Sequence, residues 1–211
     1  MRKVLRQNFK CEEDIMLEED KATVLYDINR KKIYIEGRIE SDSHLLFNNA
    51  VDALKEAYFD KELAQCFLDE ITVEINSAGG SINGCFLILE EMKALQEEGI
   101  VLNTGCEEFA MSAGCFLLLG STNGKRRARK HSRCMLHRPL FSIGEETPIT
   151  YESISSYKKE LDSSWLPIKE LIETRTNLPK AKIKLIEKGE DLNLTPEEAL
   201  EYGIVTEIIP L

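Results

Sequence analysis

A ten-residue apolar run with a serine near its start constrains the fold of this chain more than any other stretch. It covers residues 111–120 and reads Met-Ser-Ala-Gly-Cys-Phe-Leu-Leu-Leu-Gly. The run is too short to span a membrane and is typical of a buried helix. Its small first residues allow a tight turn from a preceding strand, which we expect at residues 100–103.

Ser112 would lie at the start of this helix, beside backbone amides without intrahelical partners and at the positive end of the dipole. That position favours the negative charge that develops when a serine acts as a nucleophile. It equally favours a serine that only caps the helix, since serine is a preferred capping residue. The residue alone leaves both roles open.

A second strand, turn and helix precede this one. Residues 71–75 (Ile-Thr-Val-Glu-Ile) are rich in β-branched side chains and predict a strand, and residues 82–95 carry apolar side chains at helical spacing. Between them lie Gly79 and Gly80, which permit positive φ and close approach of the backbone to a ligand. Their amides could point at an anionic or carbonyl oxygen, or the glycines could simply form a tight loop. Neither GxxxxGK[ST] nor GxGxxG is present, so a phosphate-binding loop is not supported.

A short apolar strand at residues 133–137 ends in His137, directly before Arg138 and Pro139. A histidine at a strand end is well placed to face a cleft, but a structural histidine fits the pattern equally well.

The other expected elements are strands at 24–26, 32–36 and 204–209, a connection at 104–109, a polar loop at 189–195 that supplies Asp191, a capped helix from Thr195, and helices from Ser43, at 150–175 and at 179–187. Pro167 should kink or divide the helix at 150–175.

Composition limits the classes of function. A chain of 211 residues that is 43% hydrophobic can bury one core. We expect a single domain over residues 23–211 after an acidic N-terminal arm or poorly ordered extension at 1–22. The net charge of -10 argues against a nucleic-acid partner. The basic run at 125–130 is therefore interpreted as a solvated strand edge.

Neither a membrane association nor a cofactor is expected. No stretch of eighteen apolar residues and no signal peptide are visible, which favours a cytoplasmic protein. The six cysteines are scattered without a CxxC pair, so we interpret most of them as reduced core residues rather than as disulfides or a metal site.

Four motifs in one order resemble the Clp-type caseinolytic peptidases (ClpP). Residues 75–82 resemble the family's Asn-Ser-Pro-Gly-Gly-Ser motif, with Ala78 in place of proline. Residues 110–116 are similar to its Ala-Ser-Met-Gly nucleophile motif, with Ala113 in place of methionine. Residues 133–139 resemble the strand with the family histidine before Gln-Pro, and Asp191 matches the third member of its catalytic triad. The chain is thus identified as a divergent member over about residues 30–209.

The resemblance implies an α/β fold of the ClpP/crotonase type, a spiral of repeated βα units with a protruding handle helix near 150–175. It also implies a triad in which Ser112 is the nucleophile, His137 the base and Asp191 the residue that orients the imidazole. The amides of Gly80 and Ala113 would form the oxyanion hole. No metal and no cofactor are implied.

The implied activity is that of a serine endopeptidase that hydrolyses unfolded polypeptides or peptides inside a ring chamber. The rings would be heptamers or double heptamers of this chain, with a Clp-family ATPase as a possible partner. One alternative is a weakly active or regulatory ring subunit that assembles with a paralogue. Another is acyl-CoA chemistry on the same fold, although that chemistry does not need a serine, a histidine and an aspartate in this order.

Overall fold

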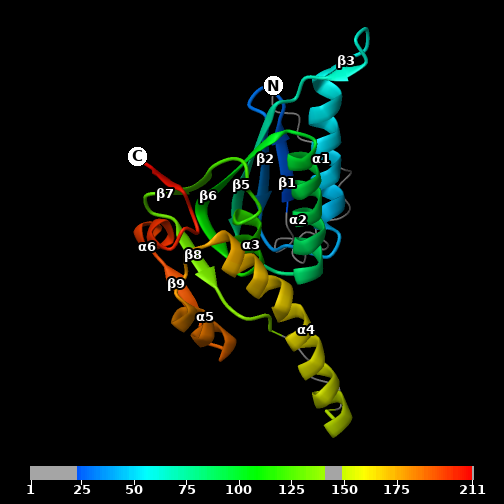
Figure 1. The fold of residues 1–211 in the computed structure, drawn as a ribbon. Helices are drawn as coiled ribbons and strands as arrows, with labels where there is room; N and C mark the ends of the chain where they lie inside the picture. The colour runs from blue at the N-terminus through cyan, green and yellow to red at the C-terminus, as the bar shows by residue number, and fades with distance from the viewer. Residues whose placement is uncertain (1–22, 141–148, 211) are drawn as a thin grey trace, which may run out of the picture.

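The structure is a computed structural model that describes residues 23–140 and 149–210 (Figure 1). The N-terminal arm expected at residues 1–22 lies outside the described residues. The strands are β1 (Thr23–Asp27), β2 (Lys32–Glu36), β3 (Phe59–Asp60), β4 (Gln65–Cys66), β5 (Glu70–Ser77), β6 (Val101–Met111), β7 (Arg126–Arg129), β8 (Arg133–Leu136), β9 (Leu192–Leu194) and β10 (Glu207–Ile209). The helices are α1 (Ser43–Ala57), α2 (Ile82–Glu97), α3 (Ala113–Leu118), α4 (Tyr151–Arg175), α5 (Lys180–Glu187) and α6 (Pro196–Glu201).

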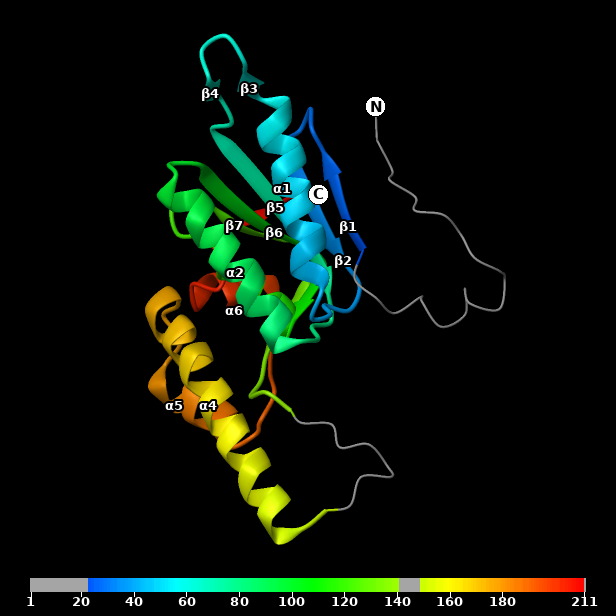
Figure 2. The same ribbon diagram turned by 90° about the vertical axis from the view of Figure 1, so that its right-hand side faces the viewer.

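A mostly parallel sheet forms the centre of the fold, in the order β1-β2-β5-β6-β7-β10. Every pair from β2 to β10 along this path is parallel, and α1 and α2 run side by side across one face (Figure 2). Parallel strands need crossover connections, and helices between them bury the apolar face. Ile33, Ile35, Val73 and Ile75 are accordingly buried. The α/β class expected from the sequence is confirmed.

The long helix α4 extends away from the sheet, as the handle expected near 150–175 should (Figure 1). It continues through Pro167 as one helix, so of the two effects expected of this proline, a kink or a division, the division is wrong. Trp165 lies buried before the proline, and Ile168 and Ile172 lie buried after it. Because the helix is packed against the protein on both sides of the proline, the hydrogen bond that proline cannot donate does not end it.

Two segments expected as loops are partly strands. Residues 104–109 continue β6, which pairs first with β7 and then with β8. Residues 192–194 form β9, which pairs antiparallel with β8. In both cases the partner strand is distant in sequence, so local composition does not report the pairing.

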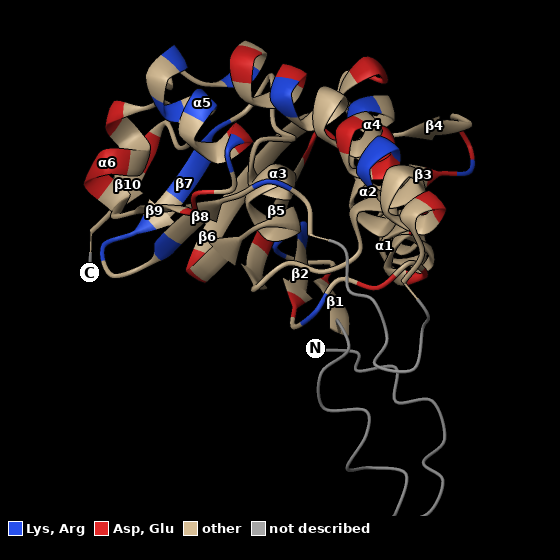
Figure 3. Ribbon diagram, turned by 90° about the horizontal axis from the view of Figure 1, so that it is seen from below, with Lys and Arg blue, Asp and Glu red and all other residues tan. Residues whose placement is uncertain are grey.

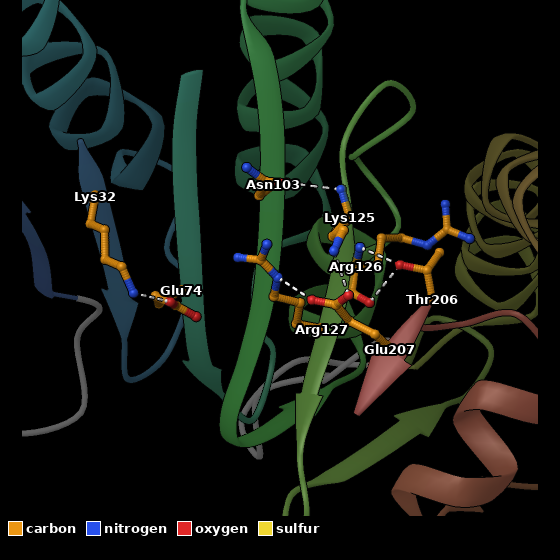
Figure 4. Close-up of polar contacts among 8 residues, drawn as sticks. All are labelled: Lys32, Glu74, Asn103, Lys125, Arg126, Arg127, Thr206 and Glu207. Carbon is orange, nitrogen blue, oxygen red and sulfur yellow. Dashed lines mark hydrogen bonds and ion pairs between the residues drawn. The ribbon is translucent and has the colours of Figure 1, made fainter. Parts of the chain in front are cut away.

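The basic run at 125–130 is not a solvated strand edge, because β7 lies between β6 and β10. Arg126 is half-buried, and its guanidinium donates to four backbone carbonyl oxygens, those of Ser121, Arg175, Gly203 and Ile204. Lys125 and Arg127 bind Glu207 of β10, at 2.8 and 2.6 Å (Figure 4). The basic stripe along β7 (Figure 3) therefore binds the C-terminal strand and the ends of neighbouring elements.

The described cysteines are free thiols, and four of them, Cys85, Cys106, Cys115 and Cys134, are buried as expected. Cys66 is the exception and is exposed on β4. Within residues 23–140 and 149–210, no helix combines the length and apolar character that crossing a membrane requires.

Candidate active site

Ser112 lies at a sharp turn between the end of β6 and the start of α3. Its backbone has φ 52° and ψ −124°, a conformation that costs a residue other than glycine about 1–3 kcal/mol and is common at active sites. Its N–H donates to the carbonyl of Met135 on β8, at 2.9 Å. The side chain makes no capping hydrogen bond. Of the two roles that the sequence left open, the structure therefore does not show the capping role.

His137 lies directly beside this turn, with its Nε2 2.6 Å from the Oγ of Ser112. The register of the sheet brings the two together. Met111 of β6 pairs with Met135 of β8, and each strand ends either at this pair or one residue after it. The imidazole is 14% exposed. Burial lowers the pKa of His137 from its usual value. The negative charge of Asp191 raises this pKa, but by less than burial lowers it. A neutral imidazole can accept the proton of a serine hydroxyl.

Asp191 approaches the other ring nitrogen of His137. Leu136 of β8 pairs with Leu192 of β9, so the next position along the antiparallel ladder sets His137 opposite Asp191. Its Oδ1 lies 3.9 Å from Nδ1, which is longer than a hydrogen bond, and the carboxylate is 58% exposed. The structure thus brings the three predicted residues to one place, with the Ser112–His137 contact closer than the His137–Asp191 contact.

The glycine-rich turn after β5 packs against the serine. Gly79 and Gly80 have φ of +104° and +142°. A Cβ on Gly79 would lie 2.6 Å from the Cβ of Ser112 and 3.1 Å from the amide nitrogen of Ala113. Only glycine allows the chain to pass so close. The loop that contains the Gly80 amide therefore adjoins the first amide of α3.

Ile39 fixes this turn and was not singled out in the sequence. Its N–H donates to the carbonyl of Gly79 at 2.8 Å, and its carbonyl accepts from the N–H of Ser81 at 2.6 Å. A single bridge of this kind has no periodic pattern, so no sequence signal could have revealed it.

A cavity of about 520 Å³ opens on the side of His137 and Asp191 that faces α4. Apolar side chains line most of it, and Arg138, Lys158 and Asp162 add charges. Such a cavity could accept a side chain of a bound peptide. Across the part of the chain that the structure describes, no cluster of three His, Cys, Asp or Glu side chains could hold a metal ion.

Comparison with known proteins gave two findings. The family model of Clp protease matches residues 31–210, a range that includes all the candidate site residues. The ATP-dependent Clp protease proteolytic subunit 1 of Bacillus cereus is 34% identical over 168 residues, which cover 79% of this chain and 75% of that protein.

Proposed function

The chain belongs to the Clp protease family, whose members are serine peptidases, and we propose that it is a serine endopeptidase acting on unfolded polypeptides or peptides. The observation that carries this proposal is the 2.6 Å contact between Oγ of Ser112 and Nε2 of His137 at a strained strand-to-helix turn. A strained serine whose side chain makes no capping bond, in contact with a largely buried histidine, suits a nucleophile activated by a base.

In the proposed reaction, Oγ of Ser112 attacks the peptide carbonyl carbon while its proton passes to Nε2 of His137. The tetrahedral intermediate then collapses, the C–N bond breaks, and Nε2 returns the proton to the leaving amine. Water, activated by the same imidazole, hydrolyses the acyl-enzyme and restores Ser112. Asp191 orients the imidazole and stabilises its cation.

The oxyanion of each intermediate would bind the amides of Gly80 and Ala113. This assignment is supported by the packing of the Gly79–Gly80 turn against Ser112 and by the free first amide of a helix. Hydrogen-bond donors fixed in advance at this position stabilise the charge that develops in the transition state.

A fluorophosphonate should label the wild-type chain once, at Ser112, because the base beside it makes that hydroxyl nucleophilic. Peptide mapping by mass spectrometry would identify the modified residue. Ser163→Ala, which changes an exposed serine on α4, should be labelled like the wild type, whereas Ser112→Ala should not. A folded protein that stays unlabelled would contradict the proposal.

The acid limb of the pH profile of kcat/KM should lie below pH 6.5. Burial lowers the pKa of His137 from that reference value, and only the neutral imidazole accepts the serine proton. Activity is therefore full above the lowered pKa and falls about tenfold for each pH unit below it. Initial rates with a fluorogenic peptide between pH 4.5 and 8 would measure this limb, and a midpoint above 6.5 would refute the assignment of His137 as a buried base.

We also propose that the chain works as a ring, a heptamer or double heptamer, whose chamber encloses the active sites. The uninterrupted handle α4 supports contacts between rings, because it carries exposed apolar side chains at Tyr151, Ile154 and Leu166. The Bacillus cereus relative is named as a subunit of an ATP-dependent Clp protease, and this name supports a Clp-family ATPase as the partner. Native mass spectrometry of the purified chain tests the ring.

One observation favours a second candidate, a weakly active or regulatory ring subunit that assembles with a paralogue. The His137–Asp191 distance of 3.9 Å leaves the imidazole without a direct hydrogen bond to the carboxylate. Fluorophosphonate labelling separates the two candidates, since a regulatory subunit would form rings without being labelled.

A further inference from the structure

Arg138, the residue directly after His137, joins three elements beside the candidate site. Its Nη2 forms an ion pair with Asp162 on α4. Its Nη1 donates to the carbonyl of Glu187, the last residue of α5, at 3.3 Å. Nε is buried and has no hydrogen-bond partner among the described residues, so the two terminal nitrogens hold this side chain in place.

The end of α5 is also fastened to α4 through the side chain of Glu187. Its Oε1 accepts from Lys169 Nζ at 2.6 Å and from Trp165 Nε1 at 3.3 Å. The hydrogen bond from Lys169 lowers the pKa of the Glu187 carboxyl, so the group is ionised at neutral pH. Asp162, Trp165 and Lys169 follow one another at helical spacing, so one side of α4 binds both Arg138 and Glu187.

The turn from Glu187 to Asp191 is short and internally hydrogen-bonded. Gly189, with φ +93°, donates to the carbonyl of Ile186 at 2.9 Å, and Glu190 donates to that of Leu185 at 3.1 Å. These are the two bonds of a glycine-terminated helix end. Since the turn is closed in this way, the position of Glu187, together with the pairing of β9 with β8, sets where Asp191 lies.

Arg138 is therefore connected to both partners of the 3.9 Å contact between His137 and Asp191. It is bonded covalently to His137, and it is hydrogen-bonded to the residue four positions before Asp191. The Asp191 carboxylate is more than half exposed and makes no direct bond to Nδ1, so its distance from the ring depends on how the turn is held.

We propose that Arg138 is a positioning residue: anchored by Asp162 of α4, it holds the turn at 188–191 so that the Asp191 carboxylate faces His137. This inference rests on the proposed function, in which Asp191 orients the base. Because Asp162 lies on α4, a movement of α4 would move the anchor of Arg138 and so change the position of Asp191 in the active site. Arg138 itself contacts none of the proposed reacting atoms.

The kinetic test compares Arg138→Gln, Asp162→Asn and the double variant in the full chain. Each single change should lower kcat for a fluorogenic peptide, by up to about 10²-fold, with KM little changed, because the orientation of the base is lost and substrate contacts are not. The double variant should be no worse than the more severe single variant, since both remove one interaction. Arg129→Gln is the matched control, because it breaks a bidentate pair with Glu107 away from the site and should leave kcat unchanged.

A second measurement does not depend on activity. The pKa of His137 can be followed through its Cε1–H NMR signal, assigned with a His137→Gln variant against His44 and His131. Loss of the Arg138 positive charge alone would raise this pKa, whereas withdrawal of Asp191 lowers it. We expect a fall in Arg138→Gln, in the same direction as in Asp191→Asn.

An unchanged or raised His137 pKa in a folded Arg138→Gln variant would overturn the inference, as would multiplicative losses of kcat in the double variant. Failure of the proposed function looks different. In that case the wild type neither cleaves peptides nor reacts with a fluorophosphonate, while the NMR titration still decides whether Arg138 holds Asp191 near His137.

Discussion

Replacing Ser112 with alanine should abolish peptide hydrolysis and leave the protein folded. The substitution removes only Oγ, whose one described contact is Nε2 of His137 at 2.6 Å. The backbone bond from Ser112 to Met135 stays, and no capping bond is lost because the side chain makes none. Loss of the nucleophile from a serine protease lowers kcat by at least about 10⁴-fold, and we expect a loss of that size.

Initial rates with a fluorogenic peptide, taken together with native mass spectrometry and thermal unfolding, would measure both halves of this prediction. Ser163→Ala, an exposed serine on α4, serves as the control and should match the wild type in all three. Equal turnover by Ser112→Ala and the wild type would exclude Ser112 from the mechanism and with it the serine-peptidase assignment.

The parts of the site that the sequence could predict are those encoded locally. A β-branched run, two glycines and an amphipathic helix predicted the first strand, turn and helix, and the apolar run from residue 111 predicted α3. Gly79 and Gly80 adopt the positive φ that the turn was expected to need. The closeness of Ser112 and His137 followed from the family resemblance, and their catalytic roles stay predictions.

The parts that the sequence could not predict depend on long-range pairing. Residues 104–109 have no clear strand pattern, yet they pair with β7 and β8. Asp191 lies opposite His137 because β9 pairs antiparallel with β8, a strand more than fifty residues earlier. The bridge at Ile39 is also distant in sequence from the turn that it fixes, which contains Gly80. Such contacts are decided by burial and register in the whole fold, which periodicity in a short window does not report.

The sequence also could not predict which arginine side chains bind backbone carbonyls. Arg126 lies in a basic run that suggests a solvated surface, yet its guanidinium binds four carbonyl oxygens. Arg138 likewise contacts a carbonyl at the end of α5. A carbonyl acceptor belongs to every residue, so neither partner leaves a signature in the sequence.

Gly80→Ala should lower kcat by about 10²–10³-fold, the usual effect of removing one donor from an oxyanion hole. The new Cβ would lie 2.1 Å from the carbonyl oxygen of Ile39, and the residue has φ +142°, a conformation that alanine rarely adopts. Because the contact is with backbone, the turn itself has to move, and the proposed Gly80 donor moves with it. Steady-state rates with a fluorogenic peptide measure the loss, with KM as the check on substrate binding.

Gly99→Ala is the matched control for this substitution. Gly99 follows α2 and also has positive φ, at +91°, but a Cβ there would meet nothing within 4 Å. Both variants therefore carry backbone strain, and only Gly80→Ala carries the clash with the Ile39 backbone. We expect Gly99→Ala to unfold at a somewhat lower temperature with unchanged kcat. Wild-type kcat in folded Gly80→Ala would show that the amide of Gly80 does not stabilise the oxyanion, whereas an equal loss in both variants would assign the effect to strain alone.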